Sequence, residues 1–263
     1  MLKKLIKYEL ISTFKFISIF YILGITFAIL TRIFFSIDNS LIFEILGQIT
    51  TGATISMLVS IIINNLMRQW VKFKNTLYDD EAYLTHTLPI SKKTLYLSKF
   101  LTSFIVMIIS FLVSALILFI AYYSKENIEM LKSFILPITT ILNSTALKII
   151  FILIFILFIE IFYALLCGYL GIIIGHRFNT NKILKSVIFG FISYIISQII
   201  VLIIIFLIAL FNKDLMIIFT TNMVTEPNIL MTLSYIFIVI YSSLIILNMY
   251  VSINLFKKGV NLD

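Results

Sequence analysis

Charged residues are scarce in this chain of 263 residues. Asp, Glu, Lys and Arg together make 12% of the sequence, whereas hydrophobic residues make 61%. Soluble globular domains carry roughly 25% charged residues, and the mean hydropathy of this chain is +1.14. The composition therefore excludes a soluble globule and points to membrane-spanning segments.

Residues that build reactive or metal-binding sites are also scarce. The single cysteine, Cys167, lies within an apolar stretch, so it forms no disulfide within the chain and is expected to pack in the interior. The two histidines, His86 and His176, have no Cys or His at metal-ligand spacing, which argues against a zinc site. The phosphate-loop pattern Gly-x-x-x-x-Gly-Lys-Ser/Thr and the His-Glu-x-x-His pattern are missing. The sequence therefore predicts no enzyme, and no cofactor or metal in this chain.

Proline occurs only three times, at Pro89, Pro137 and Pro227, each outside the long apolar stretches. Six stretches have roughly the 20 apolar residues that a helix needs to cross a bilayer core about 30 Å thick. They cover about residues 16–36, 41–66, 100–123, 147–174, 187–211 and 231–255. Strand alternation is absent, so helices are favoured over a barrel. The predicted fold is all-α and integral to the membrane, with six transmembrane helices in a single domain over 1–263.

The basic residues predict the orientation in the membrane. With the N-terminus in the cytoplasm, fifteen of the twenty Lys and Arg residues lie on the inner side. Cytoplasmic segments of membrane proteins carry such an excess, and six spans put both termini on one side. We therefore expect both termini in the cytoplasm. The net charge of +8 is assigned to orientation and to attraction by anionic lipid, and not to nucleic-acid binding.

The first fifteen residues have a basic amphipathic pattern. Their lysines share one arc of a helical projection, with leucine and isoleucine roughly opposite. The pattern is imperfect, because Glu9 falls among the apolar positions and two apolar residues fall among the lysines. It predicts a short interfacial helix, the alternative being a lysine-rich start of the first span. No small-residue cleavage site follows, so the first span is expected to stay uncleaved.

Much of the remaining charge gathers between the second and third spans, in the segment Lys72–Lys93. Three consecutive acids at 79–81 favour a helix N-terminus, and Pro89 discourages helix at the residue before it. We expect a helix of about two turns over Asp80–Thr87, with Ser91 as the N-cap of the next helix. Such a short helix is unstable alone in water. It is expected to dock on a partner protein, the alternative being its own flanking helices or lipid headgroups.

The acids, followed by Tyr-Leu-Thr-x-Thr-Leu-Pro-Ile-Ser and a Leu-x-x-Ser-Lys start of a span, resemble the intracellular loop of bacterial ABC-2 type transporter permeases. The resemblance is strongest over residues 75–100, and the six-span layout with an N-terminal interfacial helix also matches. It implies a split exporter, in which two permease subunits work with two copies of a separate ABC ATPase subunit. ATP and Mg²⁺ would bind to that ATPase. The second permease is a copy of this chain or a sister chain.

In that family the loop between spans two and three carries a coupling helix, which rests in a groove of the ATPase. By resemblance, Tyr83 and Leu84 are hydrophobic anchors, and the acids pair with basic groove residues or cap the helix. The residues with this implied coupling role are Asp79, Asp80, Glu81, Tyr83, Leu84, His86, Leu88 and Pro89.

Glu160 is the only acid well inside a predicted span. Because a carboxylate in lipid costs several kcal/mol, Glu160 is expected to face the bundle interior, a dimer seam or water. Two interpretations stay open: a residue of a substrate cavity or gate, and an interhelical hydrogen bond to Ser, Asn or Tyr. Downstream, Gly171 and Gly175 form a Gly-x-x-x-Gly pair that permits close helix packing.

The expected function is thus that of a non-catalytic permease subunit of an ATP-driven exporter, in the plasma membrane of a bacterium. Its apolar spans suit lipophilic or amphipathic cargo such as a peptide, drug or lipid. An ion- or proton-coupled carrier without an ATPase is the main alternative, and a non-transporting immunity or sensor protein is another. The segments 124–146 and 212–230 are expected outside. The first of these is partly apolar and is expected to dip toward the membrane or cap the spans.

Overall fold

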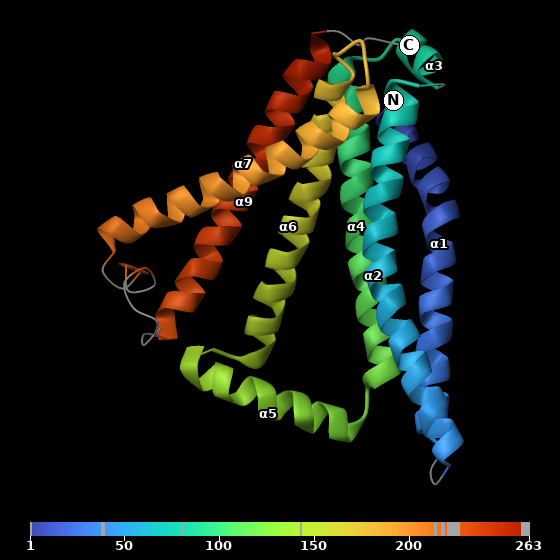
Figure 1. Ribbon diagram of the computed structural model, residues 1–263, viewed down its shortest axis with the longest axis vertical. Helices are drawn as coiled ribbons and strands as arrows, with labels where there is room; N and C mark the ends of the chain where they lie inside the picture. The colour runs from blue at the N-terminus through green and yellow to red at the C-terminus, as the bar shows by residue number, and fades with distance from the viewer. Residues whose placement is uncertain are drawn as a thin grey trace. The chain divides into compact units, whose positions relative to one another are not determined.

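The computed structural model describes residues 2–37, 40–79, 81–142, 144–212, 215–216, 219 and 227–258. Within these ranges the chain is helical and contains no strand (Figure 1). The helices are α1 (Leu2–Phe35), α2 (Leu41–Leu77), α3 (Ala82–Thr87), α4 (Lys92–Tyr122), α5 (Lys125–Leu142), α6 (Ala146–Gly175), α7 (Lys182–Phe211) and α9 (Pro227–Lys257).

Six of these helices are long and apolar enough to cross a membrane, and they contain the six stretches expected from the sequence to within one residue, at the C-terminal ends of the first and third stretches. The candidate spans are Leu2–Phe35, Leu41–Leu77, Lys92–Tyr122, Ala146–Gly175, Lys182–Phe211 and Ile229–Lys257. The prediction of an all-helical, multi-pass membrane protein is therefore confirmed. The cytoplasmic position of the two termini stays a prediction.

The first helix is longer than one span requires. Its 34 residues correspond to about 51 Å at 1.5 Å per residue, whereas a bilayer core takes about 30 Å. No break separates the first fifteen residues from the expected span at 16–36, so they continue as one helix with it. Their location in the membrane interface stays a prediction.

The chain divides into two compact units, residues 1–129 and 130–263. The expectation of one domain over 1–263 stays a prediction. In the first unit, α1, α2 and α4 pack on one another around a core that includes Ile17, Ile61 and Val106. Polar groups lie between these apolar residues. The Nδ2 of Asn65 donates to Ser110 Oγ at 2.8 Å, and Ser110 Oγ lies 2.7 Å from the Tyr21 hydroxyl.

In the second unit, α6 packs along α7 and α9. Its core includes Tyr163, Tyr241 and the buried Cys167, so the expected packing role of the cysteine is confirmed. The helices α6 and α7 approach closely where the Gly-x-x-x-Gly pair lies. A Cβ atom on Gly171 would lie 2.5 Å from the backbone nitrogen of Gly190. The close packing predicted for this pair is therefore confirmed.

The two segments expected outside differ in what the structure describes. The segment 124–146 is largely the helix α5, with exposed apolar side chains such as Met130, Leu131 and Phe134. Pro137 lies inside this helix and outside the candidate spans. The segment 212–230 lies mostly outside the described residues.

Candidate functional site

The loop between the second and third spans begins as a continuation of α2. This helix runs to Leu77, eleven residues beyond residue 66, where the predicted membrane span ends. It closes with a backbone hydrogen bond of 2.8 Å from Tyr78 N–H to the Lys74 carbonyl oxygen. Beside it, Lys74 Nζ forms a 2.7 Å salt bridge with Asp79 Oδ2. The Asp79 carboxylate therefore already has a basic partner, Lys74, within the chain. A basic groove on a partner protein would have to share Asp79 with Lys74.

The short helix expected over Asp80–Thr87 is present as α3, but its bounds are Ala82–Thr87. Asp80 lies outside the described residues. Glu81 occupies the N-cap position and makes no side-chain cap hydrogen bond, so the capping role expected of the acids is not seen at Glu81. Instead, the Ala82 N–H donates to the Asp79 carbonyl oxygen at 2.8 Å. Glu81, the residue before Ala82, lies in a turn and not in the helix.

The end of α3 follows the expected physical chemistry. Leu88, the residue before Pro89, has extended backbone angles of φ −64° and ψ 137°, which ends the helix as the proline predicts. The Ser91 side chain then accepts a hydrogen bond of 3.2 Å from the Thr94 N–H. Ser91 is therefore the N-cap of α4, as predicted.

The helix α3 has one buried side and one exposed side. Ala82 is fully buried, and the His86 ring nitrogen Nε2 lies 3.1 Å from the Leu77 carbonyl oxygen at the end of α2. On the other side Tyr83 is 62% exposed and Leu84 is 75% exposed, and Leu88 is also exposed. The helix thus rests on its flanking helix, and it still presents two large apolar side chains outward.

A buried charged cluster, made of Glu9, Lys72 and Lys99, joins α1, α2 and α4. Lys72 Nζ forms a 2.8 Å salt bridge with Glu9 Oε2, and Lys99 pairs with the other carboxylate oxygen. Lys72 also donates to the Glu9 carbonyl oxygen at 2.7 Å and to Thr13 Oγ1 at 3.1 Å. Lys99 is only 4% exposed. These contacts hold α1 against the two helices that carry α3.

Sequence reasoning did not assign a role to this cluster. The available signal was the position of Glu9, which falls on the apolar side of an amphipathic segment. A buried carboxylate requires cationic or hydrogen-bonding partners. A glutamate on the apolar side of this segment was therefore a signal of a buried ion pair. Its partners lie 63 and 90 residues away in the sequence, and no local pattern names them. The Glu81 carboxylate of the α3 loop also attracts Lys99 electrostatically.

Glu160 lies in the second unit and contacts α7. The Tyr194 hydroxyl donates to Glu160 Oε1 at 3.2 Å. Close by in the sequence, Gln198 Oε1 accepts a hydrogen bond of 3.1 Å from the Tyr241 hydroxyl of α9. The interhelical hydrogen bond to a tyrosine, one of the two interpretations of Glu160, is present. The cavity or gating role of Glu160 stays a prediction.

Within the described ranges, no three His, Cys, Asp or Glu side chains lie close enough together to hold a metal ion. No protein-family model, curated protein or solved structure matches the chain. The resemblance of residues 75–100 to ABC-2 type permeases therefore stays a prediction.

Proposed function

We propose that this chain is the membrane permease subunit of an ATP-driven exporter, working with a separate ABC ATPase subunit. The observation that carries the proposal is the exposed pair Tyr83–Leu84 on α3. Burying a side chain of this size contributes about 1.5–3 kcal/mol, so the pair is suited to filling an apolar groove on another protein. Interface anchors are typically such side chains, surrounded by polar neighbours.

The surroundings of α3 support a role in transmitting movement. The helix contacts α2 and has the His86 ring against the Leu77 carbonyl oxygen, and α4 starts at the Ser91 cap four residues after α3 ends. A partner that pulls on α3 would therefore move α2 and α4 together. The buried charged cluster then carries the displacement to α1. In this mechanism, ATP binding to the partner closes two ATPase copies, and the spans of two permease subunits change from inward- to outward-facing.

The chain would perform no chemistry itself, and ATP and Mg²⁺ would bind to the partner. The expected spans are rich in Ile, Leu and Phe, and Glu160 is the one acid well inside them. This composition suits lipophilic or amphipathic cargo such as a peptide, a drug or a lipid. The proposed location is the plasma membrane of a bacterium.

The test is co-purification with an ATPase. The tagged chain is coexpressed with phosphate-loop ATPases encoded in its source genome, and complexes are isolated in mild detergent. We expect one ATPase to co-purify and its vanadate-sensitive ATP hydrolysis to be recovered. The double variant Tyr83→Ala/Leu84→Ala should lower the recovered ATPase at least about tenfold, because two anchors are truncated.

The matched control is Met130→Ala/Leu131→Ala on α5, which truncates two similarly exposed apolar side chains on the side expected to face outward. It should retain the ATPase. The proposal fails if no ATPase binds to the unchanged chain, or if the Tyr83/Leu84 variant retains as much as the control.

The hydrogen bond between Tyr194 and Glu160 favours one second candidate, a proton-coupled carrier. Ionisable groups inside spans frequently belong to proton or ion pathways. In this case, proteoliposomes containing the purified chain would transport cargo under an imposed proton gradient without ATP. Glu160→Gln would abolish that transport, whereas loss of transport on removing ATP would exclude the carrier.

A further inference from the structure

Glu160 is a carboxylate without a basic partner in the described part of the second unit. It lies in the middle of the 30 residues of α6. The basic residues of α6, α7 and α9 all lie near the helix ends, at Lys148, Lys182, Lys185 and Lys257. Among the described residues, no Lys, Arg or His lies within salt-bridge distance of the Glu160 carboxylate. The spans around Glu160 therefore supply no cation to balance its charge.

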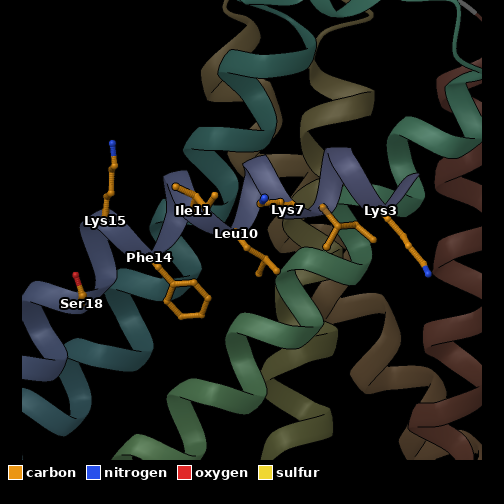
Figure 2. Close-up of a pocket in the computed structure, with 8 residues that line it drawn as sticks. Lys3, Lys7, Leu10, Ile11, Phe14, Lys15 and Ser18 are labelled. Carbon is orange, nitrogen blue, oxygen red and sulfur yellow. The ribbon is translucent and has the colours of Figure 1, made fainter. Parts of the chain in front are cut away.

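The situation differs from that of the lysines near the start of α1. Lys3, Lys7 and Lys15 lie on an open face of this helix and are exposed. Figure 2 shows the Lys3 and Lys15 side chains extending away from the helix, so water can hydrate their ammonium groups. A charge in the middle of a membrane span has no such access to bulk water and costs several kcal/mol when it is isolated. Glu160 therefore requires either a proton or a cation from outside the chain.

Side chains from three helices surround the Glu160 carboxylate. The Tyr194 hydroxyl of α7 donates to Glu160 Oε1 at 3.2 Å, and Gln198 lies one turn further along the same face of α7. Gln198 Oε1 accepts a hydrogen bond of 3.1 Å from the Tyr241 hydroxyl of α9, which Glu160 also affects electrostatically. The Tyr163 ring of α6 packs edge-on against Tyr241, with 5.7 Å between the ring centroids. We call these five residues the Glu160 cluster.

Two polar atoms of the Glu160 cluster have no hydrogen-bond partner among the described residues. They are Glu160 Oε2 and the buried Gln198 Nε2. Glu160, Tyr194 and Gln198 are only partly buried, so a ligand can reach them. A free carboxylate oxygen pairs with a cationic nitrogen, and aromatic rings attract cations as well. The amide group of Gln198 can donate to an oxygen atom of the same ligand.

We propose that the Glu160 cluster binds the cationic group of an amphipathic ligand, with Glu160 Oε2 as the partner of its N–H group. The apolar body of the ligand then contacts the Ile, Leu and Phe side chains of the spans. That this ligand is the cargo rests on the proposed exporter function, whereas the binding does not. A proton held by Glu160 is the competing explanation, and the test distinguishes it from a bound cation.

The test measures the binding of two dyes to the purified full-length chain in nanodiscs of phosphatidylcholine, which has no net charge. Rhodamine 6G is a lipophilic cation, and rhodamine 19 is its free acid, with the same ring system and N–H groups but no net charge. Fluorescence anisotropy reports binding, and empty nanodiscs give the uptake by lipid alone. We expect saturable binding of rhodamine 6G and at least about tenfold weaker binding of rhodamine 19.

Variants of Glu160 show whether its charge is responsible. Glu160→Gln should weaken rhodamine 6G binding at least about tenfold, because a charged hydrogen-bond acceptor is lost. Glu160→Asp keeps the charge and should bind more tightly than Glu160→Gln. The matched control, Glu126→Gln/Glu129→Gln, removes two exposed carboxylates of α5 and should bind as the unchanged chain does. Circular dichroism and gel filtration report the folding of each variant.

A second measurement uses the unchanged chain and does not depend on the folding of a variant. Dicyclohexylcarbodiimide modifies carboxyl groups in apolar surroundings, and mass spectrometry locates the product. Bound rhodamine 6G should protect Glu160 from this reagent, whereas rhodamine 19 at the same concentration should not. The proposal is overturned if rhodamine 6G does not bind saturably, if both dyes bind equally, or if Glu160→Gln binds as the unchanged chain does. Equal modification of Glu160 with and without rhodamine 6G also overturns it.

This result and the result for the proposed exporter function are independent of each other. The dye measurements use the chain without an ATPase, so failure to bind rhodamine 6G leaves co-purification of an ATPase unaffected. A chain that retains no ATPase but binds rhodamine 6G through Glu160 would contradict the exporter and support the cation site. Failure of the one proposal can therefore be distinguished from failure of the other.

Discussion

At the scale of single residues, the best-defined polar feature is the carboxylate of Glu9 between two lysines. One acid and two bases lie in a largely buried setting, so the cluster keeps a formal charge of +1. A buried ion pair is weak evidence for net stabilisation, but removing one partner leaves an uncompensated charge and is strongly destabilising. The cluster should therefore be sensitive to the loss of Glu9 in particular.

We expect Glu9→Gln to lower the free energy of unfolding by about 3–5 kcal/mol, because the buried Lys99 and the partly buried Lys72 then repel each other without an anion between them. Thermal or denaturant unfolding in detergent measures the change. The matched control is Glu44→Gln at the exposed start of α2, which should cost less than about 1 kcal/mol. Combining Glu9→Gln with Lys99→Met should recover part of the loss, and a larger loss in the double variant would contradict the explanation.

A second residue-level prediction concerns the contact between α6 and α7. Gly171→Ala places a methyl group 2.5 Å from Gly190 N and from the Ser186 carbonyl oxygen, so the two helices must separate. Overpacking of this kind costs about 1–3 kcal/mol. Gly52→Ala on α2 meets no atom within 4 Å and should change stability by less than about 1 kcal/mol. Unfolding measured for the two variants side by side tests the difference, and equal effects would show that helix propensity dominates.

At the scale of elements, α3 is a six-residue helix between two long ones. Isolated helices shorter than about 12 residues are marginal in water, so α3 depends on contacts through Ala82 and His86 for its order. On its other side, Tyr83 and Leu84 are largely exposed. An element of this kind belongs to the low-stability end of a fold, where local opening needs little free energy.

Hydrogen exchange followed by mass spectrometry should show this difference. We expect the amides of residues 82–87 to exchange much faster than those in the middle of α2 and α4 in the isolated chain. Addition of the co-purifying ATPase should slow exchange at 82–87, and Tyr83→Ala/Leu84→Ala should remove that protection. Slow exchange at α3 in the chain alone would mean that the helix is already fully supported, and would count against docking.

The sequence predicted α3 closely in some respects and not in others. Pro89 and Ser91 act through their nearest neighbours, so the end of α3 and the start of α4 were predictable from local chemistry. The start of α3 was not, since it depends on a backbone turn at Asp79 and on the Lys74–Asp79 salt bridge. Hydropathy marks the membrane boundary, while a helix ends where its hydrogen bonds end.

At the scale of the whole molecule, six helices within the described ranges are long and apolar enough to span a membrane. Composition alone was sufficient to predict them, because a span of about 20 apolar residues has few alternatives in lipid. The pairing of helices was not predictable. The Gly-x-x-x-Gly pair predicted a close contact on α6, but it did not identify α7 as the partner. Contacts such as Glu9 with Lys99, or Tyr194 with Glu160, join positions that are distant in the sequence. No local or periodic sequence pattern predicts such contacts.

The predicted topology can be tested with the cysteine content of the chain. Cys167 is buried, so it should not react with a membrane-impermeant maleimide. Leu84→Cys should be labelled only after the cells are permeabilised, because α3 is expected in the cytoplasm. Lys132→Cys on α5 should be labelled in intact cells. Labelling of both positions from the same side would refute the orientation derived from the basic residues.

The sequence separation within the Glu9 cluster also has a consequence for biogenesis. Lys72 and Lys99 follow Glu9 by 63 and 90 residues. While the chain is being synthesised, the Glu9 carboxylate must therefore remain hydrated until α2 and then α4 have left the ribosome. The N-terminal end of α1 can reach its final position only after its second partner helix, α4, has emerged, so the completion of α4 is the step that closes this part of the molecule.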